Sequence, residues 1–141
     1  MGLYTSFIEE QCQKEQLRRD SFHIAIVLAP SGKVKWFSKD SAAALGYEQS
    51  ELEQVLACNP IHPDDIDRVR AQFQQLFRES KRVQITCRCR KKDGEFVKVH
   101  SEALPVYKGK IIEGYLILSR LKTVDLSRVL FHTKCEAVRT R

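Results

Sequence analysis

Residues 82–94 read RVQITCRCRKKDG. Apolar or thiol side chains alternate with polar ones from Val83 to Arg90, and this alternation predicts a β-strand with one buried face. Asp93-Gly94 follows, the dipeptide that most strongly favours a tight turn between antiparallel strands. The stretch therefore predicts a β-hairpin, in which residues 95–107 form the returning strand.

Further turn signals extend the sheet on both sides of this hairpin. Lys108-Gly109-Lys110 separates the returning strand from a last apolar strand over residues 111–121. Pro30-Ser31-Gly32 divides an almost wholly apolar strand, residues 22–29, from an alternating strand over residues 33–37. Five antiparallel strands are thus predicted, two near the start of the chain and three towards its end.

Helices are predicted between the two groups of strands. Ser38 and Ser50 have the side chains that favour helix starts, and Gly46 ends the first of two short helices. The longest helix spans residues 63–79, because Pro63 fits a first helical position and the two aspartates after it complement the helix dipole.

The first 20 residues have a different character. Residues 3–19 lack Gly and Pro and carry a broken apolar stripe, which predicts a moderately amphipathic helix. Such a helix is marginal alone and must dock on another surface. With strands at both ends and helices between them, the expected class is α+β, a five-stranded sheet with helices on one face.

From about residue 22 to residue 123 these motifs resemble a PAS domain. Leu45-Gly46-Tyr47, His62-Pro63-Asp64-Asp65, the Lys92-Asp93-Gly94 hairpin and Glu113-Gly114-Tyr115 stand in that family's order. The resemblance implies a sheet in the order 2-1-5-4-3 around a small cavity. It divides the chain into an N-terminal flanking helix (1–21), the PAS domain (22–122) and a basic C-terminal extension or connector helix (123–141).

The resemblance implies a non-catalytic sensor or protein-interaction module of intracellular signalling. Ligand or partner binding would be coupled to an output domain through flanking helices and dimerisation. One alternative is the PAS domain of a transcription regulator that acts through protein–protein dimerisation. A second alternative is a haem-based sensor.

The composition bounds these interpretations. The chain has 141 residues, 43% of them hydrophobic, and five cysteines at irregular spacings. The odd count favours reduced thiols and a cytoplasmic protein, or a nuclear one for a eukaryotic regulator. No apolar run approaches the ~18 residues that cross a bilayer. No nucleophile elbow, phosphate-binding loop or metal-ligand cluster is present, so neither an enzyme nor a metal site is expected.

The net charge of +6 is concentrated near the C-terminus. Residues 120–141 hold six basic and two acidic side chains, which leaves +2 for the other 119 residues. The basic residues are Arg120, Lys122, Arg128, Lys134, Arg139 and Arg141, and the acids are Asp125 and Glu136. The first 119 residues are almost balanced in charge, so direct nucleic-acid binding is not expected.

The cofactor stays unidentified from sequence, with haem or flavin as possible groups. His62 is explained better as a helix-boundary residue than as a haem ligand. The flavin-reactive cysteine motif of the light-sensing branch is absent, and the sequence around Cys58 does not match it. Cys87 and Cys89 share a strand face with Val83 and are interpreted as core residues, with redox sensing as the alternative.

The sequence leaves two alternatives open inside the fold: a pocket for a small apolar ligand, or a core that the same side chains fill completely. The candidate lining of the pocket is Ile26, Leu28, Phe37, Leu45, Leu52, Ile61, Phe73, Phe77, Ile85, Val99, Leu116 and Leu118.

The outer face of the sheet is the predicted contact with a second PAS domain, in a homodimer. The last strand carries apolar side chains on both faces, and an exposed apolar face needs a cover, either from the chain's own first helix or from a partner. The expected interface residues are Leu3, Phe7, Leu17, Tyr115 and Ile117.

Overall fold

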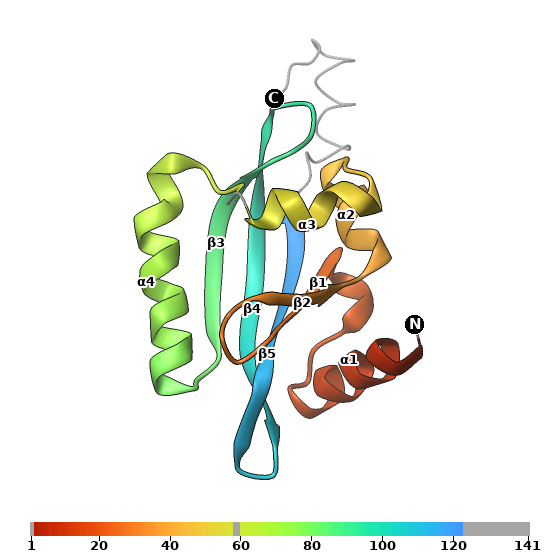
Figure 1. Ribbon diagram of the computed structural model, residues 1–141, viewed down its shortest axis with the longest axis vertical. Coiled ribbons are helices and arrows are strands. Elements are labelled where there is room, and N and C mark those ends of the chain that lie inside the picture. Colours follow the sequence, from red (N-terminus) through yellow and green to blue (C-terminus); the bar gives the residue numbers. More distant parts are fainter. Residues whose placement is uncertain (1, 58–59, 123–141) are drawn as a thin grey trace, which may run out of the picture.

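The computed structural model describes residues 2–57 and 60–122, which form a five-stranded antiparallel sheet with flanking helices (Figure 1). The strands are β1 (Ile24–Leu28), β2 (Val34–Phe37), β3 (Val83–Arg90), β4 (Phe96–Lys108) and β5 (Ile111–Lys122). Their order in the sheet is β2-β1-β5-β4-β3, so the first strand lies beside the last. The predicted α+β class and strand order are confirmed.

The hairpin of β3 and β4 forms where the sequence predicts it. Eight residue pairs align from Val83↔Ala103 to Arg90↔Phe96. In the turn the Gly94 N–H donates to the Lys91 carbonyl at 2.9 Å, and Gly94 adopts a φ of 93°, which favours glycine. The turn chemistry therefore fixes the register of the two neighbouring strands.

Three helices connect β2 to β3: α2 (Lys39–Leu45), α3 (Gln49–Ala57) and α4 (Pro63–Glu79). They pack on one face of the sheet, which we call the inner face; Figure 1 shows α4 running beside β3. The His62 ring caps α4, since its Nδ1 accepts the Asp64 N–H at 3.1 Å. None of the helices in residues 2–57 and 60–122 combines the length and apolarity needed to cross a membrane.

The first helix, α1 (Gly2–Lys14), is shorter than predicted. Gln16 takes a left-handed conformation with φ of 59°, and the Leu17 N–H donates to the Cys12 carbonyl at 2.7 Å. This is a Schellman end, which a sequence without glycine does not signal. A short 3₁₀ turn, η1 (Arg19–Ser21), then leads into β1.

The α1 helix covers the opposite, outer face of the sheet. Ile8 and Cys12 are buried there against Leu116 and Leu118 of β5. The prediction had the two faces of β5 reversed, because Tyr115 and Ile117 point to the inner face. Both faces of this central strand are buried and apolar, so alternation alone does not show which face is inner.

Candidate functional site

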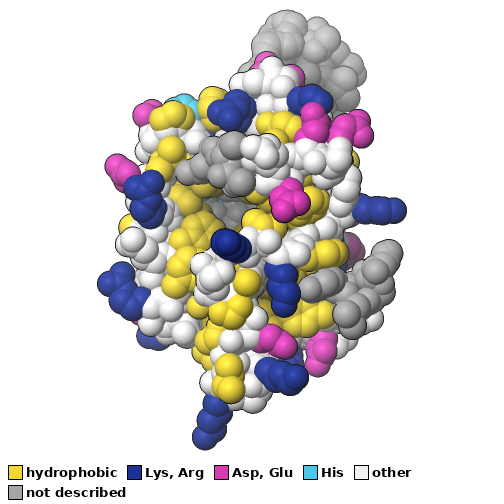
Figure 2. Space-filling view, viewed as in Figure 1, with side chains coloured by type: hydrophobic (Ala, Val, Ile, Leu, Met, Phe, Trp, Pro, Cys, Tyr) yellow, Lys and Arg dark blue, Asp and Glu magenta, His cyan; other side chains and the backbone are white. Residues whose placement is uncertain are grey.

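A cavity of about 330 Å³ lies between the inner face of the sheet and the helices α2 to α4. Figure 2 shows a hollow bordered by hydrophobic side chains on the face shared by α4 and the β1–β2 hairpin. None of the described side chains that line the cavity carries a charge. Nine predicted lining residues are among them: Ile26, Leu28, Leu45, Leu52, Ile61, Phe73, Phe77, Ile85 and Val99.

Three predicted lining residues lie elsewhere. Leu116 and Leu118 are buried on the outer face under α1, as the reversal of β5 requires. Phe37 packs in the apolar cluster around α2 and α3 without lining the cavity. The cavity is lined instead by inner-face residues of the same or neighbouring strands, including Ile24, Val34 and Ile117.

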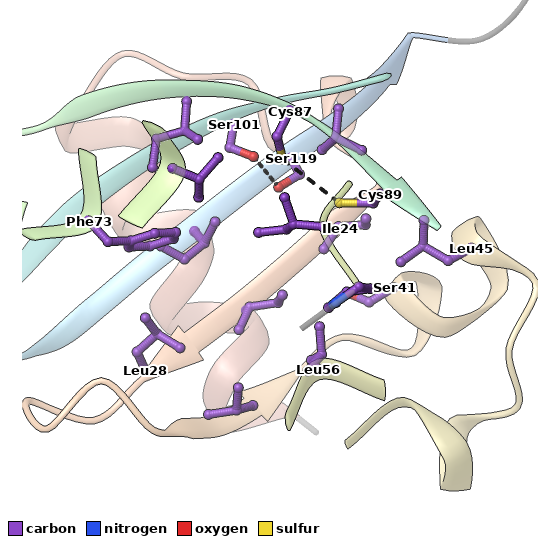
Figure 3. Close-up of a pocket in the computed structure, with 18 of the residues that line it drawn as sticks. Ile24, Leu28, Ser41, Leu45, Leu56, Phe73, Cys87, Cys89, Ser101 and Ser119 are labelled. Carbon is purple, nitrogen blue, oxygen red and sulfur yellow. Dashed lines mark hydrogen bonds between the residues drawn. The ribbon is translucent and has the colours of Figure 1, made fainter. Parts of the chain in front are cut away.

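Three serines contribute the hydroxyl groups of the wall, and sequence reasoning missed all of them. Ser101 of β4 and Ser119 of β5 are register partners, and their Oγ atoms lie 2.7 Å apart (Figure 3). The Oγ of Ser41 accepts the Ala25 N–H at 3.1 Å and pairs with the Ser38 hydroxyl at 2.9 Å. For Ser101 and Ser119, a polar residue at an inward position of a strand was the available signal, whereas Ser41 lies in α2. Because each hydroxyl is already paired, the wall remains predominantly apolar.

Aromatic rings of α4 border one end of the cavity. The rings of Phe77 and Tyr115 meet edge to face at 4.8 Å between centroids, and Phe73 lies 5.9 Å from Phe77. Phe77 is 38% exposed and its ring approaches Gly32 in the β1–β2 turn. The mouth of the cavity is therefore bordered by side chains from α4 and from the first hairpin.

Cys87 and Cys89 project from β3 into the same cavity, with their sulfurs 3.9 Å apart (Figure 3). The Cys89 thiol can donate a hydrogen bond to a Cys87 thiolate, and this contact lowers the pKa of Cys87. The same contact, together with burial, raises the pKa of Cys89 well above the usual range. Both pack in the inner-face apolar cluster, as the interpretation as core residues expects, but only Cys87 is buried, Cys89 is half-buried, and both also form part of a cavity wall.

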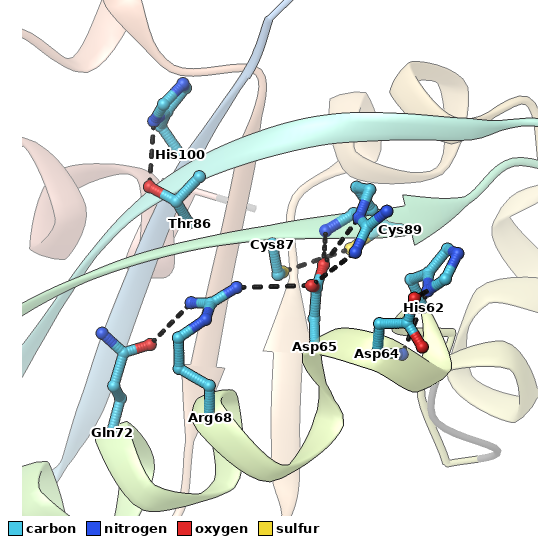
Figure 4. Close-up of polar contacts among 10 residues, drawn as sticks. His62, Asp64, Asp65, Arg68, Gln72, Thr86, Cys87, Cys89 and His100 are labelled. Carbon is cyan, nitrogen blue, oxygen red and sulfur yellow. Dashed lines mark hydrogen bonds and ion pairs between the residues drawn. The ribbon is translucent and has the colours of Figure 1, made fainter.

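Beside this wall, Asp65 joins α4 to the edge strand β3 (Figure 4). Its carboxylate accepts the Arg88 backbone N–H at 2.8 Å and two guanidinium N–H groups at 2.8 and 3.1 Å. The hydrogen bonds from Arg88 hold the pKa of Asp65 far below its usual range. The sequence placed Asp65 correctly in the first turn of α4 but gave no sign of its pairing with Arg88, and only 7% of the residue is exposed.

This pair predicts acid sensitivity. Because folding lowers the Asp65 pKa, the stabilisation is complete above the carboxyl's unfolded pKa, about 3.9, and is lost as pH falls below it. We expect Asp65→Asn to reduce the free energy of unfolding at pH 7. In this variant the free energy of unfolding should also fall less than in the wild type as pH drops from about 4 to 2. Urea unfolding at pH 7 and pH 3 measures both effects.

Asp67→Asn is the matched control, since Asp67 lies on the same helix with a 98% exposed side chain and a 3.4 Å contact to Arg70. An exposed pair contributes little, so this variant should unfold like the wild type. Equal losses for the two variants would contradict the role assigned to Asp65.

The described histidines lie away from the cavity wall. His62 caps α4, as expected of a helix-boundary residue, and its tilted ring packs against Phe96 with 4.5 Å between centroids. The His23 Nδ1 accepts the Leu121 N–H, and His100 pairs with Thr86 (Figure 4). Within the described residues, the cavity therefore offers no imidazole to a haem iron. Cys58, discussed above for flavin chemistry, lies outside the described residues.

The predicted dimer residues are divided between two faces. Phe7 and Leu17 pack against the outer-face cluster of their own chain, whereas Tyr115 and Ile117 belong to the inner-face cluster. The side chain of Leu3 lies outside the described positions, as does the C-terminal extension, residues 123–141. Placing Tyr115 and Ile117 on an outer interface was wrong, and the homodimer itself stays a prediction.

The family comparison and the structural comparison agree with this architecture. A family model described as the PAS fold matches residues 33–115, more than half of the chain. No curated protein matches the sequence.

Solved structures with the same fold come from distant organisms. A sensory box histidine kinase/response regulator from Burkholderia thailandensis is 20% identical, with a TM-score of 0.62, and the match covers 86% of this chain and 93% of that one. A PAS domain from Colwellia psychrerythraea is 21% identical, with a TM-score of 0.59 and coverage of 82% and 98%. The PAS-B domain of Drosophila melanogaster Cycle, with bound ethylene glycol, is 15% identical, with a TM-score of 0.59 and coverage of 70% and 98%.

Proposed function

The chain belongs to the PAS fold family, and from this membership we propose that it is a non-catalytic sensor domain. It binds a small apolar ligand in the cavity between the inner face of the sheet and the helices α2 to α4. The observation that carries the proposal is the cavity of about 330 Å³ with an uncharged, mainly apolar wall. This volume is at the lower end of the range for ligand pockets, which favours a compact ligand. Burying its apolar surface supplies the binding free energy.

Signal output through the flanking helix is the second part of the proposal. The inner and outer faces of β5 alternate residue by residue, so Ile117 lines the cavity while Leu116 and Leu118 support α1. Arg82 adds a polar link, with 2.9 Å to Glu102 of β4 and 3.3 Å to Glu15 just after α1. A ligand that shifts β5 would thereby change how α1 packs on the sheet. This requires the ligand to bind the shifted and unshifted arrangements of β5 and α1 with different affinity.

Ligand binding is tested by filling the cavity. The fluorescence of 1-aminoanthracene, which rises in apolar surroundings, reports occupancy of the cavity by a small aromatic probe. Ile26→Phe adds volume at a lining position, and we expect it to weaken probe binding at least about tenfold, equivalent to 1.4 kcal/mol. Thermal unfolding of the same sample checks that the variant is folded.

Lys35→Phe is the control for the added ring. Lys35 is exposed on β2 and lies beside an outer-face groove rather than the inner cavity. Wild-type affinity is expected for this variant. Saturable probe binding that survives Ile26→Phe unchanged, or no probe binding to the wild type, would overturn the proposed ligand site.

A further inference from the structure

The two cavity thiols are placed for joint binding of one ligand atom. Cys87 and Cys89 stand on the same side of β3 with 3.9 Å between their sulfurs, and both line the cavity. Cys87 is 6% exposed, so a reagent reaches it through the cavity rather than from the outer surface. The neighbouring wall is apolar, which suits a ligand that carries a hydrocarbon group.

A direct disulfide fits this geometry poorly. Two residue rises along a strand separate the Cα atoms by about 6.7 Å, at the upper limit for a disulfide. The sulfurs would also have to approach from 3.9 Å to about 2.05 Å. By contrast, a single pyramidal bridging atom with bonds to sulfur of about 2.3 Å and an angle of roughly 100° needs the sulfurs about 3.5 Å apart, so they would have to approach by only about 0.4 Å.

The rest of the wall limits which atom can bridge the sulfurs. Structural zinc takes four nitrogen, sulfur or oxygen ligands from the protein, and no group of three His, Cys, Asp or Glu residues among the described positions could hold a metal ion. The bridging atom must therefore need only two protein ligands, and it must suit an apolar wall. A soft centre that binds two thiolates and carries its own organic group meets both conditions. Trivalent arsenic with one hydrocarbon substituent has this valence.

We propose that Cys87 and Cys89 form a dithiol site for a monosubstituted trivalent arsenical, R–As(OH)₂, whose organic group occupies the apolar cavity. Each sulfur forms one bond to arsenic and each thiol proton leaves with a hydroxide as water. The balanced step is R–As(OH)₂ plus two thiols giving R–As(S-Cys)₂ and two waters, with no change of oxidation state. The inference rests on the proposed function, because it places a ligand class in the same cavity.

The protonation of the pair favours the first bond at Cys87. A hydrogen bond from the Cys89 thiol lowers the pKa of Cys87, and the thiolate is the nucleophilic form of cysteine. Once Cys87 has bonded to arsenic, it no longer carries the thiolate charge that opposes ionisation of Cys89. The second sulfur then closes a ring that includes the backbone of β3.

The probe for this test is phenylarsine oxide, which hydrates to the dihydroxy form, added to the reduced 141-residue chain. Intact mass spectrometry should show one phenylarsenic group gained and two hydrogens lost, and peptide mapping should place both bonds within the Cys87–Cys89 peptide. Cys87→Ser and Cys89→Ser should each lower the apparent affinity at least tenfold, because one thiol cannot close the ring. The wild-type peptide map keeps the test valid even if a serine variant folds poorly.

The matched control is a Cys12→Ser, Cys58→Ser, Cys135→Ser triple variant, which removes the other three thiols. Burial on the outer face raises the pKa of Cys12 and keeps it away from the cavity. This variant should bind phenylarsine oxide like the wild type. An adduct on any other cysteine, or unchanged binding by Cys87→Ser, overturns the inference.

The 1-aminoanthracene measurement separates this inference from the proposed function. Probe binding by the wild type, with no arsenic adduct at Cys87 and Cys89, overturns the dithiol site alone. Failure of the probe to bind the wild type counts against the apolar ligand site instead. Displacement of the bound probe by phenylarsine oxide would support both, because it places the two ligands in one cavity.

Discussion

Replacing Gly114 with alanine is expected to destabilise the domain by about 3 kcal/mol, at the upper end of the cost of overpacking. Gly114 lies in β5 beside the end of the neighbouring strand β1, and a Cβ at this position would overlap the carbonyl oxygen of Leu28. The obstructing atom belongs to the backbone, so it cannot rotate away as a side chain would. Relief requires β1 to move from β5, and the Leu28↔Tyr115 pairing would be lost.

Thermal unfolding measures this loss, which should lower the melting temperature by about 10 °C for a domain of this size. Gly109→Ala is the matched control, because Gly109 lies in the turn of the same hairpin with a φ of 65°, and a Cβ there would have no atom within 4 Å. It should cost only the left-handed backbone penalty of about 1 kcal/mol. Similar melting temperatures for the two variants would mean that the close approach at Leu28 does not constrain the sheet.

The sequence was sufficient for the β3–β4 hairpin because two independent local signals coincide there. Alternation from Val83 to Arg90 marks a half-buried strand, and Asp93-Gly94 marks the turn. Local signals also placed α4, from the proline at its first position. They failed at the end of α1, where Gln16 adopts a left-handed conformation without a glycine to announce it.

The candidate site was less predictable, because it depends on which face of each strand is inner. For β1 the assignment of Ile26 and Leu28 to the cavity was right, whereas for β5 it was reversed. Asp65 was assigned no partner for a related reason. Its partner Arg88 is 23 residues away, and only the docking of α4 along the edge of β3 brings the two together.

Removing the Ile8 side chain is expected to cost about 3 kcal/mol, because Ile8 is 1% exposed and anchors α1 on the outer face of the sheet. Trp36, the chain's single tryptophan, packs against the same cluster, so its fluorescence during urea unfolding reports the loss in Ile8→Ala. Glu9→Ala is the control, being the adjacent but exposed position, and should stay within about 0.5 kcal/mol of the wild type.

The same unfolding experiment decides how α1 covers the sheet in solution. The structure has α1 seated on its own chain, and a cover supplied within one molecule gives an unfolding midpoint that does not vary with protein concentration. If α1 were exchanged between two copies, the midpoint would rise with concentration in the wild type, and Ile8→Ala would lower the solution mass as well as the stability. The expected result is an unfolding midpoint that does not depend on protein concentration, together with the full loss of stability in Ile8→Ala. Any homodimer would then have to use a surface other than the one that α1 covers.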